Sequence, residues 1–170
     1  KPTDFIGVFP RLLVKEGDVV KAGTPLFVDK YRDNIIFTSP VSGVVTEISR
    51  GDKRVLEEIR IKSGDVPEYV DFGKADLSKS SRDAIIEKLL KSGIWPMIRQ
   101  RPYSIIANPS DTPKGIYVSG FDTAPLAPDY SFIVKENVPD FQSGIDVLAK
   151  LAGSPVKLGL PGGKNDFPKV

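Results

Sequence analysis

The stretch LLKSGIWPMIRQRPY, residues 89–103, separates two kinds of sequence pattern and contains the only Trp and the only Met of the chain. Before it, apolar residues alternate with polar ones and glycines are frequent; after it, strand and helix patterns follow one another. The stretch itself joins the end of a helical pattern, a glycine stop at Gly93 and a proline-bounded irregular segment. We expect it to pack two lobes together through Trp95, with ligand stacking on that ring as the less favoured alternative.

The patterns on both sides predict a fold of several lobes, α+β or α/β in class. Residues 1–67 are expected to form an all-β lobe, residues 68–111 a helical and proline-rich connecting segment, and residues 112–170 an α/β lobe of partial Rossmann-like order. The last strand pattern is not followed by a helix, which indicates that this lobe is truncated and continues in a longer protein.

Composition excludes many kinds of chemistry. The 170 residues are 40% hydrophobic and 27% charged, as in ordinary soluble domains, and the net charge of +2 gives no reason to expect nucleic acid as a partner. The absence of both Cys and His excludes disulfides, cysteine-ligated clusters, zinc sites built from these residues and nucleophiles that need a histidine base. No apolar run approaches the roughly 20 residues that span a bilayer, so any membrane association is expected through partners.

The first lobe contains two related glycine-rich units, residues 14–26 and 36–48, in which turn signals separate short strands. This arrangement resembles the biotinyl- and lipoyl-carrier family, and the resemblance implies a flattened barrel-sandwich hybrid. In that family a lysine between the two halves carries the cofactor, and Asp29-Lys30 lies near that place. Because Tyr31 follows where a small residue is typical and the tip is longer, we predict a scaffold lobe without a cofactor on Lys30.

The connecting segment is predicted to contain one amphipathic helix. Ser80 is a suitable N-cap, Asp83 suits the first turn, and the pattern stops at Gly93. The apolar stripe between them consists of Ile85, Ile86, Leu89 and Leu90. We expect this helix to dock by that stripe.

The second lobe is predicted to contain strands at residues 115–119, 132–134 and 156–160, and a helix from Pro139 to a stop at Gly153. A crossover helix between strands predicts that the strands run parallel. Ligands of open α/β sheets gather at the carboxyl ends of such strands, and the loop at residues 120–129 lies at one of these ends. It could bind a planar apolar ring or could be a rigid connection.

Several blocks together resemble the NqrA family, which supplies one subunit of the bacterial Na⁺-translocating NADH:quinone reductases. The blocks are residues 92–96, 100–103, 121–129 and the helical pattern at 141–151, in this order and after a carrier-like lobe. The resemblance implies a peripheral subunit of a six-subunit enzyme on the cytoplasmic face of the bacterial inner membrane. It implies a role in reducing ubiquinone or menaquinone, coupled to Na⁺ transport. No covalent cofactor or metal is expected in this chain, and NADH, flavins and iron–sulfur clusters are expected on partner subunits.

Loop position and side-chain chemistry indicate which residues would contact quinone. The candidates are Phe121, Asp122, Thr123, Leu126 and Asp129 in the loop, with Trp95 and Arg101 from the stretch described first. No catalytic residue is predicted, and the chain by itself is expected to be inactive.

Two other functions stay open. The chain could be a carrier-like or assembly module without catalysis, or its second lobe could bind a nucleotide. The nucleotide-binding alternative lacks a phosphate loop, because residues 158–165 have Leu158 where the first glycine of that motif belongs and Asn165 where Ser or Thr belongs.

Overall fold

The computed structural model describes residues 1–162 and residue 167, and it divides the chain into two compact units. Unit 1 consists of residues 1–76 and 83–110, and unit 2 of residues 77–82 and the described part of 111–170. The connecting segment predicted at residues 68–111 is therefore shared between the units. Most of it, including Trp95, groups with the first lobe.

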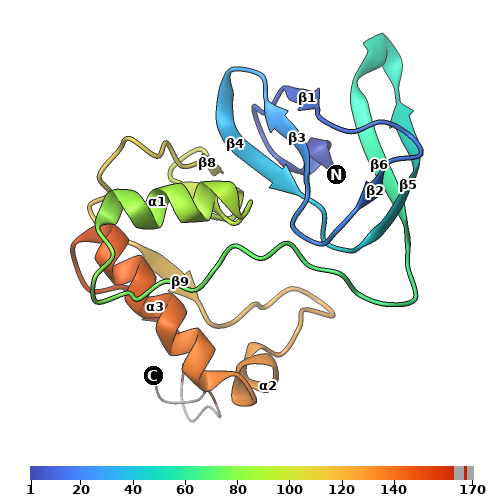
Figure 1. The fold of residues 1–170 in the computed structure, drawn as a ribbon. Coiled ribbons are helices and arrows are strands. Elements are labelled where there is room, and N and C mark those ends of the chain that lie inside the picture. Colours follow the sequence, from blue (N-terminus) through green and yellow to red (C-terminus); the bar gives the residue numbers. More distant parts are fainter. Residues whose placement is uncertain (163–166, 168–170) are drawn as a thin grey trace. The chain divides into compact units, whose positions relative to one another are not determined.

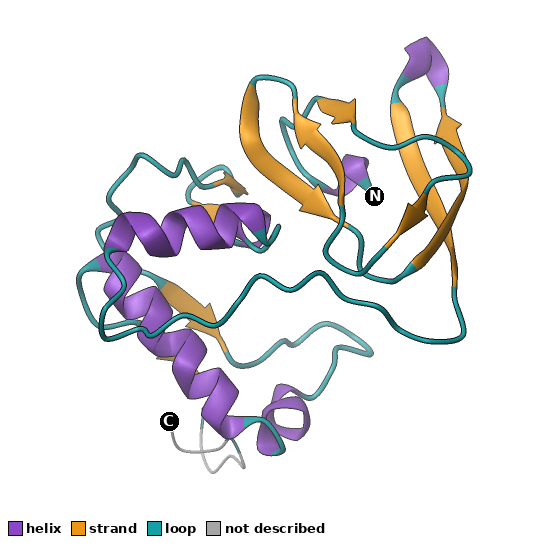
Figure 2. Ribbon diagram, in the orientation of Figure 1, coloured by secondary structure: helices purple, strands orange, loops and turns teal. Residues whose placement is uncertain are grey.

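Unit 1 contains two antiparallel three-stranded sheets (Figures 1 and 2). The first has the order β1-β3-β4, from β1 (Pro10–Leu12), β3 (Pro25–Asp29) and β4 (Arg32–Thr38). The second has the order β2-β5-β6, from β2 (Val19–Val20), β5 (Gly43–Arg50) and β6 (Leu56–Ser63). The strands in this part of the chain agree with the alternating sequence pattern.

The core of these sheets is apolar and aromatic. Phe27 and Phe37 are opposite each other on β3 and β4, and their rings stack at 4.3 Å between centroids. Such cross-strand pairs fix the register of a sheet. The other buried apolar residues of the strands are Val20, Leu26, Val28, Ile35, Val45 and Leu56.

The helical part of unit 1 packs on this β lobe. Helix α1 (Arg82–Lys91) buries Ile85 and Ile86, and all of it except Arg82 belongs to unit 1. Its position confirms the predicted helix to within two residues, and Gly93 beyond its end has φ of 73°. A 3-10 helix (Trp95–Met97) then contacts β4, and the short hairpin of β7 (Arg99–Gln100) and β8 (Ile105–Ile106) follows.

Unit 2 contains one parallel strand pair and two helices. Strands β9 (Tyr117–Ser119) and β10 (Lys157–Gly159) pair in parallel, with Val118 opposite Leu158. Helix α3 (Val138–Ala152) connects them and ends at Gly153, whose φ is 65°. The predicted parallel strands and crossover helix are thus confirmed.

One predicted strand is wrong. The segment 132–134 lies inside helix α2 (Tyr130–Lys135) rather than in a strand. Its three apolar residues match a short strand by composition, but the carboxylate of Asp129 accepts hydrogen bonds from the backbone amides of Ser131 and Phe132. This N-cap satisfies amides that a strand would have to pair elsewhere, and it starts a helix.

Segment 77–82 is held to unit 2 by side chains that reach backbone carbonyls. Arg82 donates from Nε to the carbonyl of Leu151 at 3.0 Å and from Nη2 to that of Asp111 at 2.8 Å. Lys150 on α3 donates from Nζ to the carbonyl of Leu77 at 2.7 Å. These bonds explain why a short upstream segment belongs to the later unit.

Candidate functional site

The loop at residues 120–129 lies at the carboxyl end of the parallel strand pair, as expected. It starts where β9 ends, and the amide of Gly120 still donates to the carbonyl of Gly159 at 2.8 Å, one residue beyond the paired register. Because the two strands are parallel, the residues that follow β9 and those that follow β10 lie at the same edge. The loop is therefore in the position where open α/β sheets bind ligands.

Close packing at the start of the loop requires a glycine. A Cβ atom on Gly120 would lie 2.9 Å from Cδ2 of Leu160, 3.0 Å from Cε2 of Phe167 and 3.1 Å from the carbonyl oxygen of Gly159. The neighbouring Phe121 ring lies near Gly159, and 40% of Phe121 is exposed. This ring is held close to the strand end and still offers part of its surface to a ligand.

The polar groups of the loop mainly hold the backbone. Ser119 donates from Oγ to the carbonyl of Phe121 at 2.7 Å, and Oδ1 of Asp122 accepts from the amide of Ala124 at 2.9 Å. Oδ1 of Asp129 accepts from the Ser131 hydroxyl at 2.6 Å in addition to the two amides of α2. The Ser131 hydroxyl and the Phe132 amide lower the pKa of Asp129, since both bonds favour the carboxylate. The loop is thus preorganised by its own acids.

Leu126 is the most unusual residue of the loop. It is fully exposed, and its φ of 61° lies in the left-handed region that leucine seldom adopts. It follows Pro125 in a turn closed by a bond of 3.1 Å from the amide of Ala127 to the carbonyl of Ala124. Glycine or asparagine usually takes this place in a turn, so a strained and exposed leucine suggests a function for the side chain.

The seven residues predicted to contact quinone divide between the two units. Phe121, Asp122, Thr123, Leu126 and Asp129 are together in the loop of unit 2, whereas Trp95 and Arg101 belong to unit 1. Trp95 is 3% exposed, and its indole nitrogen donates to the carbonyl of Ala107 at 2.8 Å. It packs in the core of unit 1 and presents no free ring face. Arg101 is exposed between β7 and β8.

The tip that carries Lys30 is tied to the first sheet. Lys30 is exposed, but its amide donates to the carbonyl of Phe9 at 2.7 Å, and its ammonium lies 5.8 Å from the Tyr31 ring. The neighbouring Asp29 is 1% exposed and accepts from Nε of Arg32 at 2.9 Å. Sequence reasoning missed this buried aspartate; its signal was the acidic and basic residues three positions apart in a short turn.

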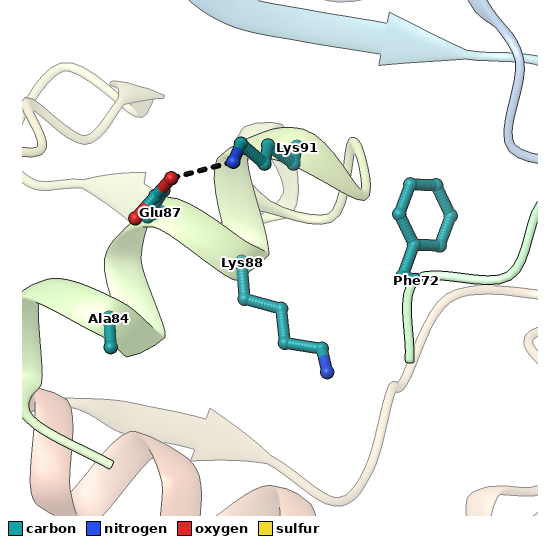
Figure 3. Close-up of a pocket in the computed structure, with 5 residues that line it drawn as sticks. All are labelled: Phe72, Ala84, Glu87, Lys88 and Lys91. Atoms are coloured by element: carbon teal, nitrogen blue, oxygen red, sulfur yellow. Dashed lines mark hydrogen bonds and ion pairs between the residues drawn. The ribbon is translucent and has the colours of Figure 1, made fainter. Parts of the chain in front are cut away.

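A shallow hollow on unit 1 was also not anticipated from the sequence (Figure 3). It has a volume of about 240 Å³, and its lining residues are Phe72, Ala84, Glu87, Lys88 and Lys91. Lys91 forms an ion pair with Glu87 at 2.6 Å, and Lys88 donates to the carbonyl of Gly73. Because both ammonium groups are occupied and ligand pockets usually exceed about 300 Å³, the hollow is a weaker candidate than the loop.

Two kinds of feature are missing from the described residues. Among residues 1–162 and 167, no cluster of three or more carboxylates could hold a metal ion. The helices of that same part of the chain are all too short or too polar to cross a membrane.

Comparison with known proteins identifies relatives along nearly the whole chain. A family model described as the NqrA N-terminal barrel-sandwich hybrid domain matches residues 1–64. A second family model, described as the NqrA second alpha/beta domain, matches residues 80–167. The first match confirms the predicted barrel-sandwich hybrid, and the second agrees with the mixed α/β content found after residue 80.

The similar curated proteins share one description, the NqrA subunit of the Na(+)-translocating NADH-quinone reductase. The protein from Alcanivorax borkumensis is 41% identical over 156 residues, which cover 90% of this chain and 35% of that protein. The protein from Serratia proteamaculans is 37% identical over 166 residues, or 95% of this chain and 37% of that protein. The chain thus spans about a third of the length of the curated relatives it matches.

Proposed function

Because this chain belongs to the NqrA family, as both domain matches establish, we propose that it is part of the NqrA subunit of a Na⁺-translocating NADH:quinone reductase. The observation that carries the proposal is the order of the two NqrA domains on one chain, together with relatives 37–41% identical. These similarities favour an enzyme subunit over a carrier-like module.

The proposal includes the setting of the whole protein. We place it on the cytoplasmic face of the bacterial inner membrane, bound to the other subunits of a six-subunit enzyme. Those subunits would hold NADH, the flavins and the iron–sulfur clusters, and quinone would be the substrate reduced. The lack of Cys and His in this chain supports a role for it in binding and positioning rather than in carrying a cluster.

Within the chain, we propose the loop at residues 120–129 as the part that contacts quinone. A quinone head group is a flat ring with two carbonyl acceptors, and its isoprenoid tail is apolar. Phe121 offers a partly exposed ring, Leu126 a fully exposed apolar side chain, and Thr123 an exposed hydroxyl that can donate to a carbonyl. Asp122 and Asp129 would shape the loop through the backbone bonds described above.

Leu126 provides a sharp test of this role in the complete enzyme. Leu126→Gly removes the side chain but suits the left-handed backbone, so the turn should persist while an apolar contact is lost. We expect Leu126→Gly and Phe121→Ala each to raise the KM for quinone or weaken a quinone-site inhibitor, with assembly unchanged. Phe132→Ala is the matched control, since Phe132 is an exposed phenylalanine on α2 outside the loop. Unchanged quinone kinetics and inhibitor sensitivity in both loop variants would make the loop a structural connection.

We also propose that unit 2 is the beginning of a Rossmann-like sheet. The support is a right-order strand, helix and parallel strand, of which the strand side chains Val118 and Leu158 are only partly buried. Parallel sheets are normally buried on both faces, so more strands and helices are expected around this pair in the longer protein. A structure of the full-length protein with no strand added beside β9 or β10 would contradict this.

A further inference from the structure

We propose that the β7–β8 hairpin and the 3-10 helix before it form a docking surface for an acidic segment of a partner protein. The surface, here called the hairpin surface, consists of Met97, Arg99, Arg101 and Tyr103. It belongs to unit 1 and is separate from the loop proposed to contact quinone. The inference does not depend on that role.

The charge of this region is one-sided. Residues 88–110 contain Lys88, Lys91, Arg99 and Arg101 but no Asp or Glu. Lys88 and Lys91 are engaged on α1, as described above, so the uncompensated charges are the two arginines of the hairpin. Arg99 lies over the Phe5 ring at 4.8 Å and donates to the carbonyl of Ser104 at 3.3 Å, which leaves its charge without a carboxylate. In the described part of the chain, Arg101 has no hydrogen bond or ion pair. The complementary partner is therefore acidic.

The hairpin surface is held rigidly from below. Trp95 is buried, and its bond to the carbonyl of Ala107 joins the 3-10 helix to the strand end after β8. The amide of Ala107 donates to the carbonyl of Ile98 at 2.9 Å, and Ile106 is fully buried. A surface whose backbone is already ordered loses little conformational entropy on binding, which favours specific docking.

The exposed side chains are of the types that dominate protein interfaces. Tyr103 is 76% exposed and Met97 is 63% exposed, and both lie beside the two arginines. Tyrosine, methionine and arginine are enriched in interface cores, whereas lysine is depleted. An anionic membrane is a poorer fit, because lipid-binding clusters usually contain about four to eight basic residues and the hairpin has two. A protein segment with Asp or Glu next to an apolar residue matches both features.

Site-specific photo-cross-linking in the full-length protein, in the cells that produce it, tests the proposal. A benzophenone side chain would replace Tyr103 in one variant and Tyr69 in the other. Tyr69 is a matched control, since it is 72% exposed on the same unit but lies among Asp65, Glu68 and Asp71. We expect position 103 to cross-link to a protein segment that contains acidic residues, and position 69 to give no such product.

A charge reversal then tests whether the arginine matters. Combined with the probe at position 103, Arg101→Glu should lower the cross-linked yield about fivefold or more, the factor that corresponds to roughly 1 kcal/mol. Arg101→Lys should keep much of it. Lys15→Glu, the same charge change at an exposed site of unit 1, should have no effect. The proposal is overturned by cross-links to lipid, by equal yields at positions 103 and 69, by no product at position 103, or by a yield that Arg101→Glu does not change.

Discussion

Asp29 illustrates how one side chain shapes a turn. Its buried carboxylate accepts from the amides of Phe9 at 3.4 Å and Tyr31 at 3.2 Å, and from Nε of Arg32 at 2.9 Å. Nη1 of Arg32 donates in turn to the carbonyl of Ile106 at 3.4 Å. The hairpin tip is thus fastened both to β1 and to β8, which suits a fixed scaffold and not a swinging carrier arm.

We predict that Asp29→Ala lowers the free energy of unfolding by about 2–4 kcal/mol. The substitution leaves two amides and a partly buried guanidinium without their acceptor, and such losses cost more than the bonds contribute. Asp33→Ala, on the exposed part of the same hairpin, should change stability by less than about 0.5 kcal/mol. Urea unfolding of the two variants measures the difference, and equal stabilities would refute this role of Asp29.

The pKa of Asp129 gives a second prediction for a single residue. The Ser131 hydroxyl and the Phe132 amide lower this pKa below its ordinary value of 3.8. A lowered pKa in the folded protein means that the carboxylate stabilises the fold above pH 3.8 and that this contribution disappears as the pH falls through the lower folded value. Ser131→Ala should raise the pKa towards its ordinary value. NMR titration of the side-chain carboxyl carbon tests this, and an unchanged pKa in the variant would contradict it.

Among the elements, α3 and β5 show that glycine has opposite roles in different places. A Cβ on Gly144, inside α3, would meet no atom within 4 Å. A Cβ on Gly43, at the start of β5, would lie 2.0 Å from the carbonyl oxygen of Lys62 on β6. The first glycine is only a weak helix former, whereas the second permits two strands to approach each other.

This contrast predicts opposite effects of the same substitution. Gly144→Ala should raise the free energy of unfolding by about 0.5–1 kcal/mol, because alanine is the better helix former. Gly43→Ala should lower it by more than about 2 kcal/mol, because the strand backbone must shift to admit the methyl group. Thermal and urea unfolding of the matched pair decide the point; a stabilising Gly43→Ala would show that the strands separate easily.

At the scale of the whole molecule, the β lobe and the segment with Trp95 form one unit. Trp95 and Ile106, both outside the β lobe by sequence, are buried in unit 1. We predict that a fragment of residues 1–110 folds with the blue-shifted fluorescence of a buried Trp95. Removing residues 68–110 exposes the core that they cover, so a fragment of residues 1–67 should unfold at lower urea. Equal urea midpoints would show that residues 1–67 are an independent unit.

Local sequence signals were sufficient for some elements and insufficient for others. The helix that ends at Gly153 and the strands on both sides of it follow from a strong apolar period and clear stop signals. The segment 132–134 did not, since three apolar residues fit a strand or a helix equally and a capping bond decided between them. For the candidate site, the loop position was predictable from strand order, whereas the left-handed Leu126 was not.

The sequence by itself determined the family, the barrel-sandwich lobe, the parallel strand pair and the chemistry that the chain cannot perform without Cys and His. These follow from periodicity, turn residues and composition, which are local properties of the chain. Only the tertiary structure decided that Trp95 is buried, that residues 83–110 join the β lobe, and that Arg101 and Tyr103 stand exposed on an acid-free hairpin. Burial and charge compensation depend on contacts between residues far apart in sequence, and no local pattern specifies them.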